Sequence, residues 1–238
     1  MIDLYAMYSP NAVRIFMALE EFALPYQLKP VDVFSGQQFD PEFRKLNPIA
    51  KVPVIVDHEG PGGKPYTVFE SAAILLYLAD KTGKLLPMDK AAHFEAVQWL
   101  IQGVTALGPM CGQYFHFLRF APPGNEYAVN RYRTQVHRVF DVAEERLGQM
   151  PYLGGSEFSV ADIAWLPRAR FLPVMLSLAG AEKFPKITEW AARLSARPAI
   201  VKALAAVDAM STKLTQLDQA TPEVLDKMFG RGEHAVAI

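Results

Sequence analysis

Residues 52–57 read VPVIVD and residues 66–69 read YTVF, and this pair of short apolar stretches decides the fold of the N-terminal half. Both are rich in β-branched and aromatic residues, which favour strands. Between them, residues 60–63 read GPGG, a composition that suits a turn. The sequence therefore predicts a β-hairpin.

A helix is predicted directly after the hairpin, over residues 71–81, and Gly83 is placed to end it. The start of a helix gathers unpaired backbone N–H groups and the positive end of the helix dipole, and so favours an anion. Glu70 and Ser71 stand at this start. They are candidate ligands for a small charged molecule.

The residues before the hairpin predict a strand over 2–5, a helix over 12–22, a second strand over 26–33 and a short helix over 43–47. Pro30 lies inside the second strand and lacks an N–H for the ladder, so we expect this strand at a sheet edge. The order βαβ, short helix, ββα is typical of a thioredoxin-like sheet.

The second half of the chain predicts helices in place of strands, beginning after a boundary at residues 84–90. Apolar residues at helical spacing over 94–107 and 127–147 predict two antiparallel helices packed together. Farther on, Ser159 and Asp162 have the spacing of a capping box. The fold class is therefore an α/β domain followed by an all-helical domain.

Composition narrows the functional classes. The 238 residues carry 24 basic and 25 acidic side chains and a formal net charge of −1, which argues against a nucleic-acid or membrane-surface partner. The single cysteine, Cys111, cannot form an internal disulfide, and we expect it to be a buried, inert thiol in a cytoplasmic protein. We expect no membrane span, since apolar runs are short, and no metal site.

Four motifs in order resemble the glutathione S-transferase family: YSPN at 8–11, KVP at 51–53, Glu70-Ser71, and SVAD at 159–162. The resemblance runs from about residue 1 to about residue 206. It implies a thioredoxin-like glutathione-binding domain over 1–83, a helical substrate-pocket domain over 91–206 and a C-terminal tail over 207–238. It also implies glutathione as co-substrate, a cis-proline at Pro53 and a homodimer.

Glutathione has two carboxylates, an amine and a thiol, so its site must hold the charged ends and favour the thiolate. Glu70 is suited to the γ-glutamyl amine, and the Ser71 hydroxyl and amide to the γ-glutamyl carboxylate. The loop of Lys51, Val52 and Pro53 offers the Val52 backbone to the cysteinyl amide, as an added strand would.

Stabilisation of the thiolate is assigned first to Ser9, with Asn11 beside it, because hydrogen bonds to a charged group suffice to lower the thiol pKa. Tyr5 and Tyr8 remain alternative donors. Residues 9–12 read SPNA where thioredoxin-like oxidoreductases hold Cys-x-x-Cys. The redox-active sulfur must therefore come from glutathione.

Further segments, GQQF at 36–39, GPMCGQ at 108–113 and FHF at 115–117, resemble the Nu class and its yeast prion-like relatives. This resemblance implies glutathione-dependent disulfide reduction with weak conjugating activity. It places Gln38 near the glycyl carboxylate and Arg131 near a second glutathione.

Phe115 and His116 are candidates for the wall of an electrophile pocket.

Two departures from the branch are Ser9, where threonine is usual, and the long tail. A conjugating, ether-cleaving or dehalogenating transferase and a non-catalytic glutathione-binding regulatory module remain alternatives. The sequence alone does not identify the second substrate, which we expect to be either a disulfide or an electrophilic small molecule.

Overall fold

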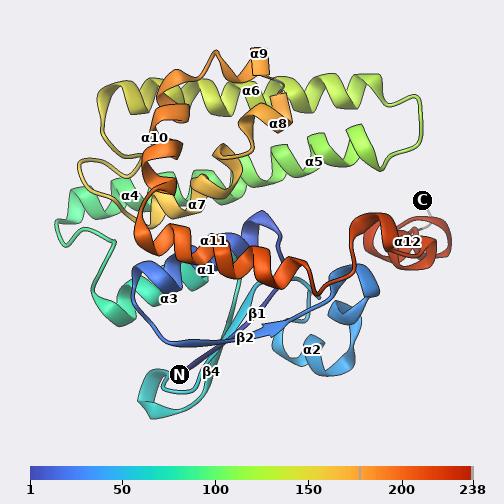
Figure 1. Cartoon of the computed structure of the whole chain (residues 1–238), viewed down its shortest axis with the longest axis horizontal. Coiled ribbons are helices and arrows are strands. Elements are labelled where there is room, and N and C mark those ends of the chain that lie inside the picture. The colour runs from blue at the N-terminus through green and yellow to red at the C-terminus, as the bar shows by residue number, and fades with distance from the viewer. Residues whose placement is uncertain (177, 237–238) are drawn as a thin grey trace.

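The computed structural model describes residues 1–176 and 178–236. A four-stranded sheet with its helices forms the N-terminal domain, and helices α4 to α11 form a second domain above it (Figure 1). The two-domain fold class is confirmed. The strands are β1 (Ile2–Ala6), β2 (Tyr26–Pro30), β3 (Val54–Asp57) and β4 (Tyr66–Phe69).

The sheet has the order β2-β1-β3-β4, with β2 parallel to β1 and the other two pairs antiparallel. This order puts β2, with its terminal Pro30, at an edge as predicted. Three helices accompany the sheet: α1 (Pro10–Glu21), α2 (Pro41–Leu46) and α3 (Ser71–Thr82). Gly83 ends α3 in the left-handed conformation, which glycine adopts without steric cost.

The helical domain is built on a long, interrupted helix. Helix α4 (Lys90–Gln102) continues through one π-helical turn, Gly103–Leu107, into α5 (Gly108–Arg119). A Cβ at Gly103 would lie 2.6 Å from the Trp165 ring, so glycine permits this close approach. The remaining helices are α6 (Glu126–Gln149), α7 (Val160–Ala169), α8 (Leu172–Leu176), α9 (Leu178–Ala181), α10 (Pro185–Ser195), α11 (Pro198–Ser211) and α12 (Pro222–Phe229).

One expectation for this domain was wrong in detail. The partner that packs along α6 is chiefly α5, and the predicted apolar face over 94–107 is only partly buried. Phe94 and Ile101 are 53% and 41% exposed. Helical periodicity identified an apolar face, but it did not indicate which of its residues another element covers.

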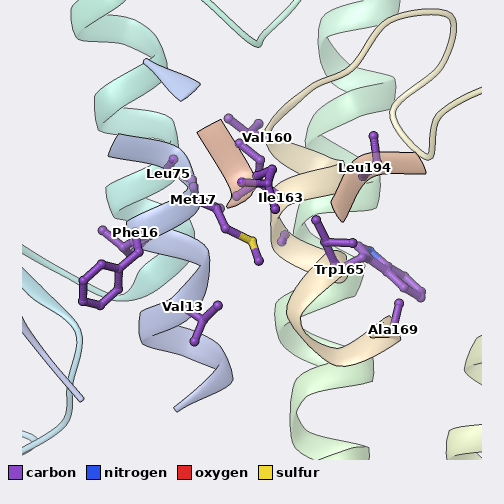
Figure 2. Packing of buried hydrophobic residues seen from close by; sticks show 14 of the residues in the cluster. Val13, Phe16, Met17, Leu75, Val160, Ile163, Trp165, Ala169 and Leu194 are labelled. Atoms are coloured by element: carbon purple, nitrogen blue, oxygen red, sulfur yellow. The ribbon is translucent and has the colours of Figure 1, made fainter. Parts of the chain in front are cut away.

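The two domains share one hydrophobic core through α1, which packs against both α7 and α11. In Figure 2, Met17 of α1 points towards α7, where Ile163 and Trp165 are buried. At the end of α1, Glu21 accepts two hydrogen bonds from Arg197, at 2.6 and 2.7 Å. Helix α1 is thus held against the helical domain along its apolar face and at its C-terminal end.

Helix α7 begins with the predicted capping box. The backbone N–H of Ser159 donates to Asp162 at 3.0 Å, and the Ser159 hydroxyl accepts from the Ala161 N–H at 3.3 Å.

Among the helices described in 1–176 and 178–236, none combines the length and the apolar character that a membrane span needs.

Candidate active site at the sheet edge

The strand register brings the predicted site segments to one edge of the sheet. Tyr5 of β1 lies opposite Val54 of β3, which in turn lies opposite Phe69 of β4. The residues just beyond these ends are Tyr8 and Ser9 after β1, Pro53 before β3, and Glu70 after β4. The Val52–Pro53 peptide bond is cis, as the resemblance implied.

A cavity of about 620 Å³ lies at this edge. It is lined by five of the predicted residues, Ser9, Asn11, Gln38, Lys51 and Val52. The other lining residues are Met7, Tyr8, Pro10, Val33, Phe34, Phe39, Ile49, Ala50, Lys227 and Met228. Lys51 and Lys227 are the charged residues among them, so the cavity wall is cationic.

Ser9 is the N-cap of α1, and its hydroxyl oxygen accepts a long hydrogen bond of 3.4 Å from the Ala12 N–H. The hydroxyl hydrogen is therefore free to donate to a ligand. Asn11 follows in the first turn and is exposed. Both side chains reach the cavity, and their catalytic roles remain predictions.

The two alternative tyrosines lie in different places. Tyr5 packs on the opposite side of the sheet from α1, with its ring 6.3 Å from that of Phe43. Tyr8 lines the cavity, and its hydroxyl donates to the Thr215 carbonyl at 3.4 Å. Burial, followed by the charges of Asp32 and Asp218, raises the Tyr8 pKa, so this phenol stays protonated at neutral pH.

Glu70 and Ser71 lie at the start of α3, outside the lining of this cavity. Glu70 has a positive φ of 68°, and its exposed carboxylate forms no ion pair with any described residue. Among the residues that the structure describes, no side chain caps the N–H groups of the first turn of α3. The Glu70 carboxylate and the uncapped N–H groups of α3 thus lie together. They can bind the ammonium group and the carboxylate of an amino acid, respectively.

Arg14 is a residue of this site that the sequence did not reveal. It is fully buried on α1 and donates from Nη1 to the Ser71 hydroxyl oxygen at 3.1 Å, while its Nε and Nη2 lack partners among the described residues. Burial, then the charge of Arg168, lowers its pKa to about 9, so it remains charged at pH 7. The bond leaves the Ser71 hydroxyl hydrogen free to donate to an anion.

A second cavity, of about 500 Å³, adjoins the first and shares Tyr8 and Pro10 with it. Phe115 lines it, but His116 does not, because neighbouring residues of a helix point about 100° apart. The His116 ring instead lies 5.1 Å from Phe229. The rest of its lining comes from α1, α7, α8 and α11 and from the short link between α7 and α8: Val13, Arg168, Arg170, Phe171, Val174, Met175, Leu204, Val207, Asp208 and Ser211.

Two further predicted residues lie away from the cavities. Arg131 is exposed on α6 and lines neither of them. Cys111 is buried, and burial raises its pKa to about 11 despite the opposing charge of Arg168. The thiol is therefore protonated and shielded at neutral pH. No cluster of metal-binding side chains occurs among the described residues.

Comparison with known proteins identifies the class. Residues 8–81 match the family described as "Glutathione S-transferase, N-terminal domain" and residues 107–198 match "Glutathione S-transferase, C-terminal domain". The chain belongs to the glutathione S-transferase family. Both matches end before the predicted tail over 207–238.

Individual relatives are similar over most of their length. The disulfide-bond oxidoreductase YfcG of Escherichia coli is 43% identical over 206 residues, which cover 86% of this chain and 94% of that protein. A Pseudomonas fluorescens glutathione transferase family member, solved with two glutathione bound, has a TM-score of 0.82 at 38% identity, covering 85% and 92% of the two chains. A Pseudomonas putida glutathione transferase, solved with one glutathione disulfide per subunit, has a TM-score of 0.82 at 35% identity, covering 85% and 90%.

Proposed function

We propose that this chain binds glutathione at the sheet edge and uses its thiolate to reduce small disulfides. The γ-glutamyl group binds at Glu70 and Ser71, the cysteinyl backbone pairs with Val52, and the sulfur lies beside Ser9 and Asn11. The remaining carboxylate, on the glycyl residue, extends towards Gln38. The similarity to YfcG and to relatives solved with glutathione supports this reading.

One observation carries the proposal: the thiol position of a thioredoxin-like site is occupied by Ser9, and the single cysteine lies elsewhere, buried in the core. The pKa of Cys111, about 11, leaves almost no thiolate at pH 7. A disulfide reductase with this architecture must therefore take its nucleophilic sulfur from the ligand.

The reaction balances with two glutathione molecules. The bound thiolate attacks one sulfur of the substrate disulfide, forming a mixed disulfide and releasing one thiolate, which takes up a proton. A second glutathione thiolate then attacks the glutathione sulfur of the mixed disulfide. This step releases the second substrate thiol and glutathione disulfide, so the substrate is reduced by two electrons and two glutathione are oxidised.

The second cavity favours one alternative activity. Its wall is largely apolar, with Phe115, Phe171, Val174 and Met175 facing the space beside Tyr8 and Pro10. An apolar electrophile bound there would lie next to the thiolate, as conjugation requires. Conjugating activity is therefore the second candidate function.

The test is a set of three measurements on the purified protein. Reduction of 2-hydroxyethyl disulfide is followed with glutathione reductase and NADPH, conjugation with chlorodinitrobenzene, and glutathione binding by calorimetric titration. Fast disulfide turnover with poor conjugation supports the proposal. Conjugation alone favours a detoxifying transferase, and tight binding with neither activity favours a regulatory module.

We also propose a homodimer, as the family resemblance implied. Exposed apolar side chains on the helical domain and on β4 support it: Phe94, Ile101, Tyr66 and Phe69 are between 36% and 53% exposed. Burying such residues against a second copy would be favourable. Light scattering coupled to gel filtration measures the mass directly.

A further inference from the structure

The chain after α11 crosses from the helical domain to the thioredoxin-like domain, beside which α12 lies (Figure 1). We call residues 212–234 the strap. Its first attachment is to the loop after β2, where the backbone N–H and the hydroxyl of Thr215 both donate to Asp32, at 3.1 and 2.7 Å. This attachment fixes the strap beside the cavity that holds Ser9.

The second attachment of the strap is to the end of α5. The Phe229 ring stacks on the Phe120 ring at 5.0 Å, and Arg231 donates from Nη1 to the Phe120 carbonyl at 3.0 Å. Arg231 is itself held by Asp226 at 2.9 Å. Helix α12 therefore lies between two attachments of the strap, one at Thr215 and one at Phe229 and Arg231, although it lies beyond residue 198, where the family match stops.

Helix α12 contributes Lys227 and Met228 to the wall of the 620 Å³ cavity. The Lys227 ammonium lies 4.6 Å from the centroid of the Phe39 ring and forms no ion pair with any described residue. Gln38 also lines this cavity; it is 3% exposed, and its Oε1 has no partner among the described residues. The Lys227 ammonium group and the buried Gln38 amide oxygen thus both belong to residues of this cavity wall, and they do not bind each other.

We propose that Lys227 binds the glycyl carboxylate of glutathione, and that the seated strap completes this end of the site. This inference rests on the proposed function. The γ-glutamyl end belongs at the start of α3, which does not line this cavity, and the thiol belongs at Ser9, which does. The glycyl carboxylate is the one remaining charged group, and Lys51 and Lys227 are the charged residues in the cavity wall.

The size of the effect follows from the exposure of Lys227. An exposed ion pair contributes less than a buried one, and salt screens it. We expect Lys227→Gln to weaken glutathione binding about 3- to 10-fold at low ionic strength. The difference from the wild type should shrink as salt is raised to 0.5 M, where the screening length falls to about 4 to 5 Å.

The experiment is a calorimetric titration with two ligands, glutathione and its glycyl ethyl ester, which lacks the negative charge at that end. Lys227→Gln should lose affinity for glutathione and bind the ester as the wild type does. Lys213→Gln is the matched control, because Lys213 is an exposed lysine of the same strap that lines neither cavity. It should bind both ligands unchanged.

A second variant tests the strap without changing the cavity charge. Phe229→Ala removes the stack on Phe120 and should weaken glutathione binding in the same direction as Lys227→Gln. The inference is overturned if Lys227→Gln binds glutathione like the wild type, or loses equal affinity for the ester. If the wild type binds no glutathione, the proposed function itself fails, which is a different result.

Discussion

The carboxylate of Asp162 is fully buried and accepts four hydrogen bonds, and its replacement by alanine gives a worked test of how the helical domain is held together. Oδ1 accepts from the Leu153 N–H at 2.9 Å and from the Trp190 indole N–H at 3.0 Å. Oδ2 accepts from the N–H and the hydroxyl of Ser159, at 3.0 and 3.2 Å. The carboxylate therefore joins the turn before α7 to α10.

Asp162→Ala leaves three buried N–H donors without an acceptor. An unsatisfied buried donor costs about 1 to 3 kcal/mol, so three of them cost about 3 to 9 kcal/mol. Because the variant also removes a charge whose burial is unfavourable, we expect it to lose about 3 to 5 kcal/mol of unfolding free energy at pH 7. This is a large share of the total for a protein whose stability is typically about 5 to 15 kcal/mol. The chain should still fold, with a lower urea midpoint.

The cost should depend on pH. Burial outweighs the four hydrogen bonds and raises the Asp162 pKa to about 6, whereas the unfolded value is about 3.9. A raised folded-state pKa contributes stability that is complete below pH 4 and is lost as the pH rises through 6. Between pH 7 and 4.5 the advantage of the wild type over Asp162→Ala should therefore grow by about 2 kcal/mol.

Urea unfolding of the wild type and of Asp162→Ala at both pH values measures this change in their stability difference. The contributions of other titrating groups are the same in both proteins and cancel when the two unfolding free energies are subtracted. Asp162→Asn is the control: it keeps one carbonyl acceptor and does not titrate, so it should cost less than alanine at pH 7. The reasoning is refuted if the wild-type advantage shrinks as the pH falls. That result would mean that the carboxylate is favoured in its charged form inside the protein.

Three further predictions concern the site. Ser9→Ala should lower the turnover of disulfide reduction at least 10-fold with little loss of glutathione affinity. If Ser9→Ala keeps its turnover while Asn11→Ala or Tyr8→Phe loses it, the thiolate donor is one of those two residues instead. Glu70→Gln should weaken glutathione binding about 10-fold and leave turnover at saturation nearly unchanged, as steady-state kinetics would show. Arg14→Met should weaken binding about 3- to 10-fold without lowering the urea midpoint, because it also removes a buried, partly unpaired guanidinium; a large loss of stability would instead make Arg14 a folding residue.

Local signals in the sequence predicted the parts of the fold that short-range chemistry controls. The edge position of β2 follows from Pro30, the end of α3 from Gly83, and the start of α7 from Ser159 and Asp162. The two helix ends depend on backbone hydrogen bonds within a few residues, and the edge position depends on the N–H group that Pro30 lacks. These features were therefore readable without knowledge of the tertiary structure.

The residues that were missed depend on distant partners. Arg14 occupies one position of a helix whose neighbours are apolar, and only the folded chain brings it to Ser71, 57 residues later. Lys227 lies on a short helix whose position is set by Asp32 and Phe120, far away in the sequence. Periodicity indicates which residues share a face, but it does not indicate what that face meets.

Helix α1 links the two domains in a way that bears on the chemistry. Ser9 is its N-cap and Asn11 lies in its first turn, and the following turns bury Val13 and Met17 against the helical domain (Figure 2). Because interiors are closely packed, a shift of α7 against α1 would move the first turn of α1 relative to Val52. The helical domain therefore supports the proposed glutathione side of the site and also contributes most of the lining of the second cavity. The strap adds a second link between the domains, from the end of α5 to the loop after β2. A ligand that contacts both Glu70 and Lys227 would thus bind to the thioredoxin-like domain and to the strap, which explains why no single segment of the sequence contains the site.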